Sequence, residues 1–232
     1  MGGGYMENLS AELMDKLGTK YAFTIPLFGG IPVPESVVVT WGIMLLLVLL
    51  SVIFVRNLKM VPGKVQCCIE ALIGWLNNFF YDIVGEEGKR YIPYLCTVIL
   101  YIGCANLTGL VGVTPPTKDL NVTAGLAIMS IVLIEYAGIH AKGPKGWLKS
   151  FAEPMPLIAP INILEVFIRP LSLCMRLFGN ILGGFVVMEL IKIVVPMVVP
   201  VPFSFYFDIF DGLIQAYVFA FLTSLFIKEA IE

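Results

Sequence analysis

The chain has 232 residues, of which 58% are hydrophobic and only 14% are charged, and its mean hydropathy is +0.90. Soluble domains of this length are more polar, so the composition predicts an integral membrane protein. The net charge of −2, with no excess or cluster of basic residues, excludes a nucleic-acid-binding protein.

Residues that commonly hold metals or redox groups are sparse. The five cysteines form no C-x-x-C pair, and most lie in apolar stretches, where a free thiol behaves as a small hydrophobic group. His140 is the only histidine, which excludes bis-histidine haem ligation within the chain. We therefore predict no disulfide, no metal site and no cofactor.

The segment 1–36 precedes the first apolar run. Glu7, Glu12, Asp15 and Glu35 stand where a cleavable signal would carry basic residues. We expect this segment to stay attached to the chain and to lie outside the cell.

Five apolar runs are long enough to be embedded in a membrane. They cover residues 37–55, 92–113, 122–140, 161–195 and 203–228. The sequence therefore predicts a single all-α membrane domain over residues 1–232, with five membrane-embedded helices.

An amphipathic helix is predicted between the first two runs, over residues 65–87. Apolar side chains recur there at helical spacing, and acidic and amide side chains lie between them. The apolar set is Cys68, Leu72, Trp75, Phe79 and Ile83. This pattern favours a helix in the membrane interface over one that spans it.

The basic residues predict the orientation. Most of them fall on one side of the predicted membrane, where they flank the amphipathic helix, occupy the loop after the third run or end the last run. They are Arg56, Lys59, Lys64, Lys89, Arg90, Lys142, Lys145, Lys149 and Lys228. The opposite side holds only Lys16, Lys20, Lys118 and Lys192. The positive-inside rule then places the N-terminus outside and the C-terminus in the cytoplasm, in agreement with an odd number of spans.

The last two helices are too long to stand upright. As a continuous helix, residues 161–193 would measure about 50 Å, whereas the hydrocarbon core is about 30 Å thick. The helix must either tilt steeply or break, and Pro170 is the residue that could kink it. The final run is also long, so we expect two strongly tilted helices.

Four polar residues follow one stripe of the fourth run: Glu165, Arg169, Arg176 and Asn180. Glu165 and Arg169 are predicted to form an ion pair at i,i+4 near the cytoplasmic interface. Arg176 has no carboxylate three or four residues away. Since a charged side chain at the bilayer centre costs at least roughly 2.5–3.5 kcal/mol, its partner must come from another helix, another subunit or water.

Small residues surround Arg176. Ser172, Gly179, Gly183 and Gly184 keep the helix slim, which permits close approach of another helix. We expect a positively charged face that meets a carboxylate from elsewhere.

The last run carries the opposite charge. Asp208, Asp211 and Gln215 stand at i, i+3 and i+7, so an α-helix places them on one face. Either the aspartates mark the helix start, where the macrodipole favours anions, or they line a hydrated path from the outside that stops near Gln215 and Arg176.

Three further embedded polar residues are weaker channel candidates: Asn106, Glu135 and Glu189. They either line water or pair with neighbours. Glu189 and Lys192 are spaced to pair at i,i+3.

Three stretches resemble the a subunit of the F-type ATP synthase membrane sector, of the bacterial type. "NILEVFIRPLSLCMRLFGNILGG" is similar to its hallmark helix, "DGLIQAYVFAFLTSLFIKEAIE" to its C-terminal helix, and "PPTKDLNVT" to the loop and helix start after the second span. They occur in the family order over more than half of the chain. The Arg-Leu-Phe-Gly-Asn core, together with the downstream Ile-Gln-Ala, is highly specific.

The resemblance implies a stator in the cell membrane with two aqueous half-channels. Arg176 matches the arginine that faces the ion-binding carboxylate of a rotating c-subunit ring and prevents ions from passing directly between the half-channels. Asn180 and Gln215 match polar neighbours of that arginine, and Asp208 matches a channel position that often holds a carboxylate or histidine. The implied partners are the c-ring, peripheral-stalk b subunits, the rest of the synthase complex, the lipid bilayer and the transported H+ or Na+.

Some positions depart from the family pattern. Phe185 falls where many members carry a polar or charged channel residue, and Asp211 falls where they are commonly apolar; Cys174 replaces a frequent small hydroxyl. Asp211 or Glu189 is then the substitute channel residue. The chain has no G-x-x-x-x-G-K-[ST] loop, so we expect no catalytic site here and assign nucleotide chemistry to other subunits.

Two other functions fit the sequence less well. A secondary transporter would use Arg176 to bind an anionic substrate, but the two halves of the chain show no inverted repeat, and five spans are few for such a fold. A purely structural membrane scaffold would leave the cost of embedding Arg176 unexplained.

Overall fold

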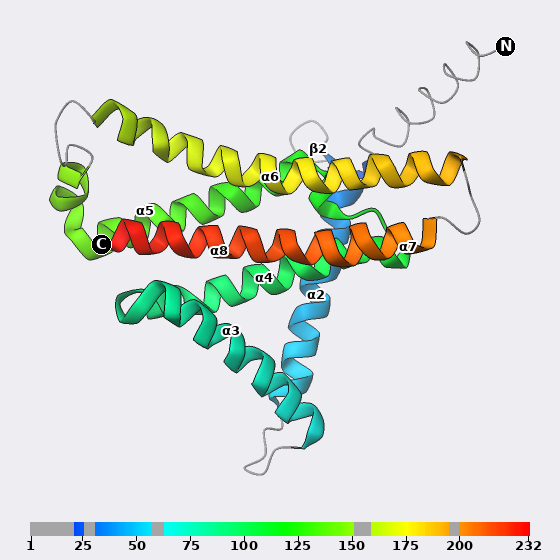
Figure 1. Cartoon of the computed structure of the whole chain (residues 1–232), viewed down its shortest axis with the longest axis horizontal. Helices are drawn as coiled ribbons and strands as arrows, with labels where there is room; N and C mark the ends of the chain where they lie inside the picture. The colour runs from blue at the N-terminus through cyan, green and yellow to red at the C-terminus, as the bar shows by residue number, and fades with distance from the viewer. Residues whose placement is uncertain (1–20, 26–30, 57–62, 151–158, 195–199) are drawn as a thin grey trace.

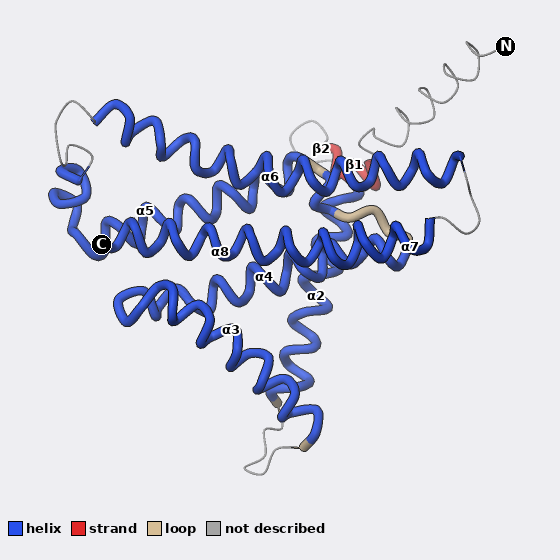
Figure 2. Tube along the Cα trace, viewed as in Figure 1, coloured by secondary structure: helices blue, strands red, loops and turns tan. Residues whose placement is uncertain are grey.

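The computed structural model describes residues 21–25, 31–56, 63–150, 159–194 and 200–232. Helices dominate these ranges (Figures 1 and 2). The exception is a two-stranded antiparallel hairpin of β1 (Tyr21–Ile25) and β2 (Ile31–Pro34), within the segment that we predicted only as external. Most of that segment, residues 1–20, lies outside the described residues.

Helix α2 (Glu35–Val55) confirms the first predicted run as a helix. It begins directly after Pro34, whose extended backbone forms the N-cap, and Glu35 occupies the first turn, where the helix dipole favours an anion. Ile43 is its only buried residue, although almost every residue of the helix is apolar. Figure 1 shows the reason, since α2 leaves the helix bundle and points away from it. Such a surface needs lipid or a partner protein to cover it.

Helix α3 (Lys64–Gly88) returns from the far end of α2 to the bundle (Figure 1). Its backbone breaks helical geometry at Gly85, where φ is +71°, a conformation that glycine adopts without steric cost. The break turns the chain into η1 (Lys89–Tyr91) and then into α4 (Ile92–Leu107).

The face of α3 that packs against the protein overlaps the predicted apolar stripe only in part, through Phe79 and Ile83. Leu76, Phe80 and Val84 are buried in the core with α4, α5 and α8, whereas Leu72 and Trp75 are exposed, Trp75 by 60%. The helix therefore has two apolar faces, one for the bundle and one still uncovered. Its position in the membrane interface stays a prediction.

The second predicted run, 92–113, ends earlier as an α-helix than expected. After α4 the chain forms two short 3-10 turns, η2 (Thr108–Val111) and η3 (Pro116–Lys118), with a left-handed Gly112 between them. The third run is longer than predicted, because α5 extends over Leu120–Ser150. Gly143, with φ +72°, and Pro144 interrupt it, so its last turns take a different direction.

The last two runs form the longest helical structures. α6 (Ala159–Val194) continues through Pro170 without a break, so the alternative of a broken helix is wrong. At 36 residues it is about 54 Å long and must tilt to fit a bilayer. The final run joins α7 (Pro200–Ser204), a π-helical segment η5 (Phe205–Asp211) and α8 (Gly212–Ile231) end to end.

Helices α4, α5, α6 and α8 pack side by side and form the bundle (Figure 1). Two clusters of buried apolar side chains hold it together: one includes Phe80 and Ile227, and the other, where α6 joins, includes Leu177 and Phe219. Five helical stretches of the described chain are long and apolar enough to cross a membrane, the second running from α3 through α4. The prediction of an all-α, multi-pass membrane protein is confirmed.

Candidate functional site

Arg176 lies exposed on α6. Among the described residues it forms no ion pair, although four such pairs occur elsewhere in the same ranges. A Cβ atom added to Gly179 or Gly183 would meet no atom within 4 Å. This face of α6 is thus open and slim, as the sequence predicted for a surface that meets another molecule.

Gly184 does not belong to that open face. A Cβ atom there would lie 3.2 Å from the ring of Phe207, so this glycine permits close packing between α6 and η5 within the chain. The prediction that it gives clearance around Arg176 is wrong, because a residue eight positions along a helix lies about 80° away around its axis.

Arg169, two turns from Arg176, is in the opposite situation. It pairs with Glu165 at 3.2 Å, which confirms the predicted i,i+4 ion pair, and also with Glu229 of α8 at 2.5 Å. Its side chain is only 14% exposed and covers the ring of Phe226 at 5.0 Å. Two carboxylates therefore neutralise this arginine within the chain.

The two aspartates of the last run lie well inside a helix. The described helical structure already begins at Pro200, so Asp208 and Asp211 are beyond its first turns. Helix-dipole stabilisation falls off within the first turn. The interpretation that they merely mark a helix start is wrong.

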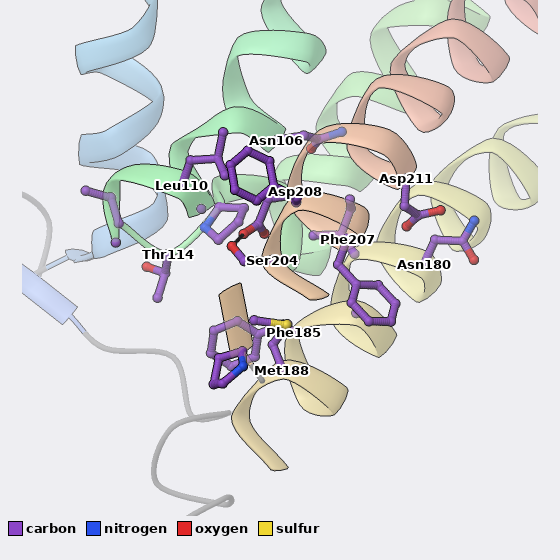
Figure 3. A pocket seen from close by; sticks show the side chains of 18 of the residues that line it. Asn106, Leu110, Thr114, Asn180, Phe185, Met188, Ser204, Phe207, Asp208 and Asp211 are labelled. Atoms are coloured by element: carbon purple, nitrogen blue, oxygen red, sulfur yellow. Dashed lines mark hydrogen bonds between the residues drawn. The ribbon is translucent and has the colours of Figure 1, made fainter. Parts of the chain in front are cut away.

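The aspartates also do not share one face. η5 is a π-helix, whose i→i+5 hydrogen bonds widen the turn and rotate each residue relative to α-helical geometry. Asp208 packs against Gly109 of η2, where a Cβ atom would lie 2.6 Å from its Oδ1, and it accepts a 2.6 Å hydrogen bond from Ser204 Oγ. Asp211 instead points toward Asn180 of α6 (Figure 3).

Both aspartates nevertheless line one cavity of about 440 Å³. It lies between η2 and the loop that follows it, α6, and the α7–η5 segment (Figure 3). Its polar lining includes Asn106, Asn180, Lys192, Ser204, Asp208 and Asp211. Phe185 and Met188 form part of its apolar wall. The structure therefore brings together three of the predicted site residues, Asn180, Asp208 and Asp211, around a space that can hold water.

Arg176 and Gln215 do not line this cavity but lie one helical turn beyond it. Arg176 precedes Asn180 by four residues on α6, and Gln215 follows Asp211 by four residues on α8. The two helices run in opposite directions (Figure 1), so both residues lie about 6 Å along the axis toward the same end of the bundle. Gln215 is buried, whereas Arg176 is exposed.

The weaker candidates all have partners. Glu189 is buried and pairs with Lys192 at 3.0 Å, as predicted. Glu135 accepts a 2.9 Å hydrogen bond from Trp147 Nε1, which holds the redirected end of α5 against its own helix. Asn106 lines the cavity, yet both ends of its amide are engaged by other residues of the chain.

Two features of this site were not predicted from the sequence. One is the π-helical geometry of η5, for which no pattern in its aromatic-rich sequence is diagnostic. The other is a cation–π contact, in which Lys118 Nζ lies 3.9 Å from the centre of the Phe185 ring. Phe185 thus brings a positive charge from η3 close to α6.

Known proteins similar to this chain point to one family. A family model described as ATP synthase A chain matches residues 37–228. The ATP synthase subunit a of Moorella thermoacetica is 35% identical over 205 residues, covering 88% of this chain and 94% of the relative. "ATP synthase subunit a, sodium ion specific" of Propionigenium modestum is 33% identical over 218 residues, covering 87% and 75%.

A third relative, the ATP synthase subunit a of Oleidesulfovibrio alaskensis, is 39% identical over 203 residues, covering 85% of this chain and 86% of the relative. The matches include both long helices that carry Arg176 and Gln215. The chain therefore belongs to the ATP synthase subunit a family, the ion-translocating membrane subunits of F-type ATP synthases.

Proposed function

We propose that this chain is a stator with two half-channels that pass H+ or Na+ to and from the carboxylates of a rotating c-subunit ring. The observation that carries the proposal is an exposed, unpaired Arg176 on a slim helix face, one turn beyond the end of an acidic cavity. Ion flow through the pair of half-channels would drive rotation, and rotation would couple it to ATP synthesis or hydrolysis in other subunits.

The cavity beside η5 is the candidate outer half-channel. Asp208 and Ser204 stand on one wall and Asp211 with Asn180 on another, so a cation that enters meets acidic and amide oxygens in succession. Such oxygens accept hydrogen bonds from water and interact favourably with a cation. Glu189 and Asn106 would support this path through their contacts rather than carry the ion, whereas Glu135 bonds Trp147 and does not line the cavity.

Exchange with the ring would take place at Arg176. A fixed positive charge favours the ionised form of a nearby carboxylate, so a ring carboxylate that reaches Arg176 releases its ion. The contact must stay loose, because a dry, hydrogen-bonded ion pair would hold the ring in place. The open face around Gly179 and Gly183 leaves room for the ring helix, and water from the half-channels would screen the pair.

The inner half-channel would lead from the ring to the cytoplasm on the other side of Arg176. This assignment uses the orientation that the positive-inside rule predicts, with the N-terminus outside and the C-terminus in the cytoplasm of a cell-membrane protein. A ring ion would then enter from one side and leave to the other only after a rotation past Arg176. Gln215, buried beside this point on α8, is the proposed polar neighbour.

The proposed partners are the c-ring on the open face of α6 and the peripheral-stalk b subunits elsewhere. The exposed apolar surface of α2 and the uncovered face of α3 are compatible with lipid or partner helices at those places. The nucleotide-binding and catalytic sites would lie in other subunits. Family membership leaves no reason to favour a stand-alone secondary transporter or a structural scaffold.

The test is Arg176→Ala in the complete complex, reconstituted in vesicles. We expect ATP-driven ion pumping to fall by about 100-fold or more, because a preorganised charge at the exchange site is lost. The matched control is Arg169→Gln, which removes an already neutralised arginine from the same helix. Coupled pumping that survives Arg176→Ala in a complex that still contains the ring would overturn the proposal.

A further inference from the structure

We propose that Asn106 is a positioning residue for ion translocation: it holds the π-helical turn η5 in the geometry that directs Asp208 toward η2 and Asp211 toward Asn180. The inference rests on the proposed function of the cavity as the outer half-channel. It assigns to Asn106 a task that differs from lining water, which is how its sequence position alone would be interpreted.

The hydrogen bonds of Asn106 leave one orientation for its amide. Nδ2 donates to the backbone carbonyl of Gly212 at 2.7 Å, and a carbonyl can only accept. Oδ1 therefore faces the other way, where it accepts a 2.7 Å hydrogen bond from Thr117 Oγ1. Asn106 is 2% exposed and Thr117 is fully buried, so the pair links the end of α4, η3 and the last helix within the protein interior.

Gly212 is the residue at which π geometry returns to α geometry. Its N–H group bonds to the carbonyls of Phe207 and Ile209, the former spanning the five residues of a π turn. Its own carbonyl is held by Asn106. Both backbone polar groups of the junction are therefore tied, one along the helix and one across to α4.

Two close contacts between the last helix and the α4–η2 segment restrict the rotation of η5. A Cβ atom on Gly212 would lie 2.9 Å from Cβ of Asn106, and a Cβ atom on Gly109 would lie 2.6 Å from Oδ1 of Asp208. At both contacts the last helix therefore packs closely against the end of α4 and against η2. Any rotation of η5 would move Asp208 out of the space that Gly109 leaves and would stretch the bond from Asn106.

The geometry of η5 decides where the acidic groups point. In an α-helix, residues three positions apart lie about 60° apart around the axis, and both aspartates would face one wall. In the π turn they serve different walls of the cavity, one near η2 and one near α6. Because π turns are rare, an external tie such as the bond from Asn106 explains why this one persists, and such turns are frequent at functional sites.

The test uses the complete complex in vesicles and measures ATP synthesis driven by an imposed ion gradient. External pH and external NaCl are varied separately to obtain the half-saturating ion concentration on the outer side. We expect Asn106→Leu, which keeps the side-chain size and removes both hydrogen bonds, to raise it by about fivefold or more. The half-saturating concentration on the cytoplasmic side, measured from ATP-driven pumping, should stay unchanged, an asymmetry that a general loss of packing would not produce.

Three further variants make the test specific. Thr117→Val removes one bond and leaves the bond to Gly212, so we expect a smaller outer-side shift of about twofold; it also keeps the test decisive if Asn106→Leu does not assemble. Ser130→Ala breaks the hydrogen bond between the buried Ser130 and Tyr94, which joins α5 to α4 away from η5, and should leave both half-saturating concentrations unchanged. In an Asp208→Asn, Asp211→Asn background, Asn106→Leu should add less than about twofold, since it acts through those carboxylates.

Equal shifts on both sides, no outer-side shift, or full additivity with the aspartate variants would overturn the inference. The proposed function is judged separately by Arg176→Ala. If that variant loses pumping while Asn106→Leu and Thr117→Val behave as wild type, the positioning role alone fails. If Arg176→Ala still pumps, the half-channel assignment fails first.

Discussion

The two arginines of α6, Arg169 and Arg176, carry the same charge in very different surroundings. Near the start of α6, Arg169 lies between Glu165 and Glu229, covers Phe226 and is mostly buried. Near the middle, Arg176 is exposed, stands beside two open glycines and has no ion-pair partner in the described part of the chain. A charge that the fold satisfies serves structure, whereas a charge that the fold leaves open in a membrane needs water or a partner from outside the chain.

The largest expected effect separates these arginines directly. Arg176→Ala should lower ATP-driven pumping by about 100-fold or more, and Arg169→Gln by less than about twofold, because only the first removes an unpaired charge. Pumping is measured in vesicles with equal amounts of assembled complex. Similar losses in both variants would mean that the difference in pairing has no functional meaning.

The second prediction concerns the open face itself. Gly183→Leu should place a bulky side chain in the space that a ring helix would occupy, and we expect ATP-driven rotation to slow by about tenfold. A Cβ atom at this position would meet no atom of the chain within 4 Å, so the yield and thermal stability of the detergent-solubilised subunit should hardly change. A normal rotation rate in single-complex measurements would show that the ring approaches elsewhere.

Gly184→Leu is the matched contrast on the inner face. Because even a Cβ atom at this position would lie 3.2 Å from Phe207, the larger side chain should push α6 from η5 and destabilise the subunit by about 1–3 kcal/mol. Thermal unfolding in detergent would measure the effect. If Gly183→Leu were the more destabilising of the two, our assignment of faces would be incorrect.

The third prediction compares two partly buried carboxylates, Asp211 and Glu135. Asp211→Asn should reduce synthesis driven by an external ion gradient by about fivefold to tenfold, since it removes a charge that lines the cavity beside Asn180. Glu135→Gln should change it by less than about twofold, because Glu135 serves Trp147 outside the cavity and an amide oxygen can still accept that bond. The reverse order would place the ion path along α5.

The smallest effect tests the satisfied arginine. Glu229→Gln removes one of the two carboxylates that pair with Arg169, while Glu165 remains. Glu229 is 59% exposed, so solvent screens the pair, and we expect the free energy of unfolding to fall by less than about 1 kcal/mol. Pumping should be normal. A large loss of pumping would indicate that this end of α6 is part of the inner half-channel.

Local patterns predicted the helices well. Hydropathy alone located α2, α4, α5, α6 and the last helix, and spacing predicted the pairs Glu165–Arg169 and Glu189–Lys192. These features depend on neighbours within a few residues, which a sequence shows directly. The same reasoning failed where a helix departs from regular geometry, as at Gly143 of α5 and throughout η5.

The face assignments divide in the same way. The spacing of Arg176, Gly179 and Gly183 correctly predicted one open surface, but Gly184 was assigned to the wrong side, and the apolar stripe predicted for α3 gave no sign that a second face of that helix packs against the bundle. Which face of an apolar helix is covered depends on the neighbouring helices, and two adjacent apolar stripes look alike in sequence.

By itself, the sequence determined that this is a membrane protein, approximately where its helices begin and end, and that Arg176 has no local counter-charge. These properties depend on length, hydropathy and spacing within single helices, which a sequence shows directly. Only the tertiary structure decided that Asp208 and Asp211 serve different walls of one cavity. The physical reason is that the π turn between them depends on contacts from α4, above all the bond from Asn106 to Gly212, which lie 106 residues apart in the chain.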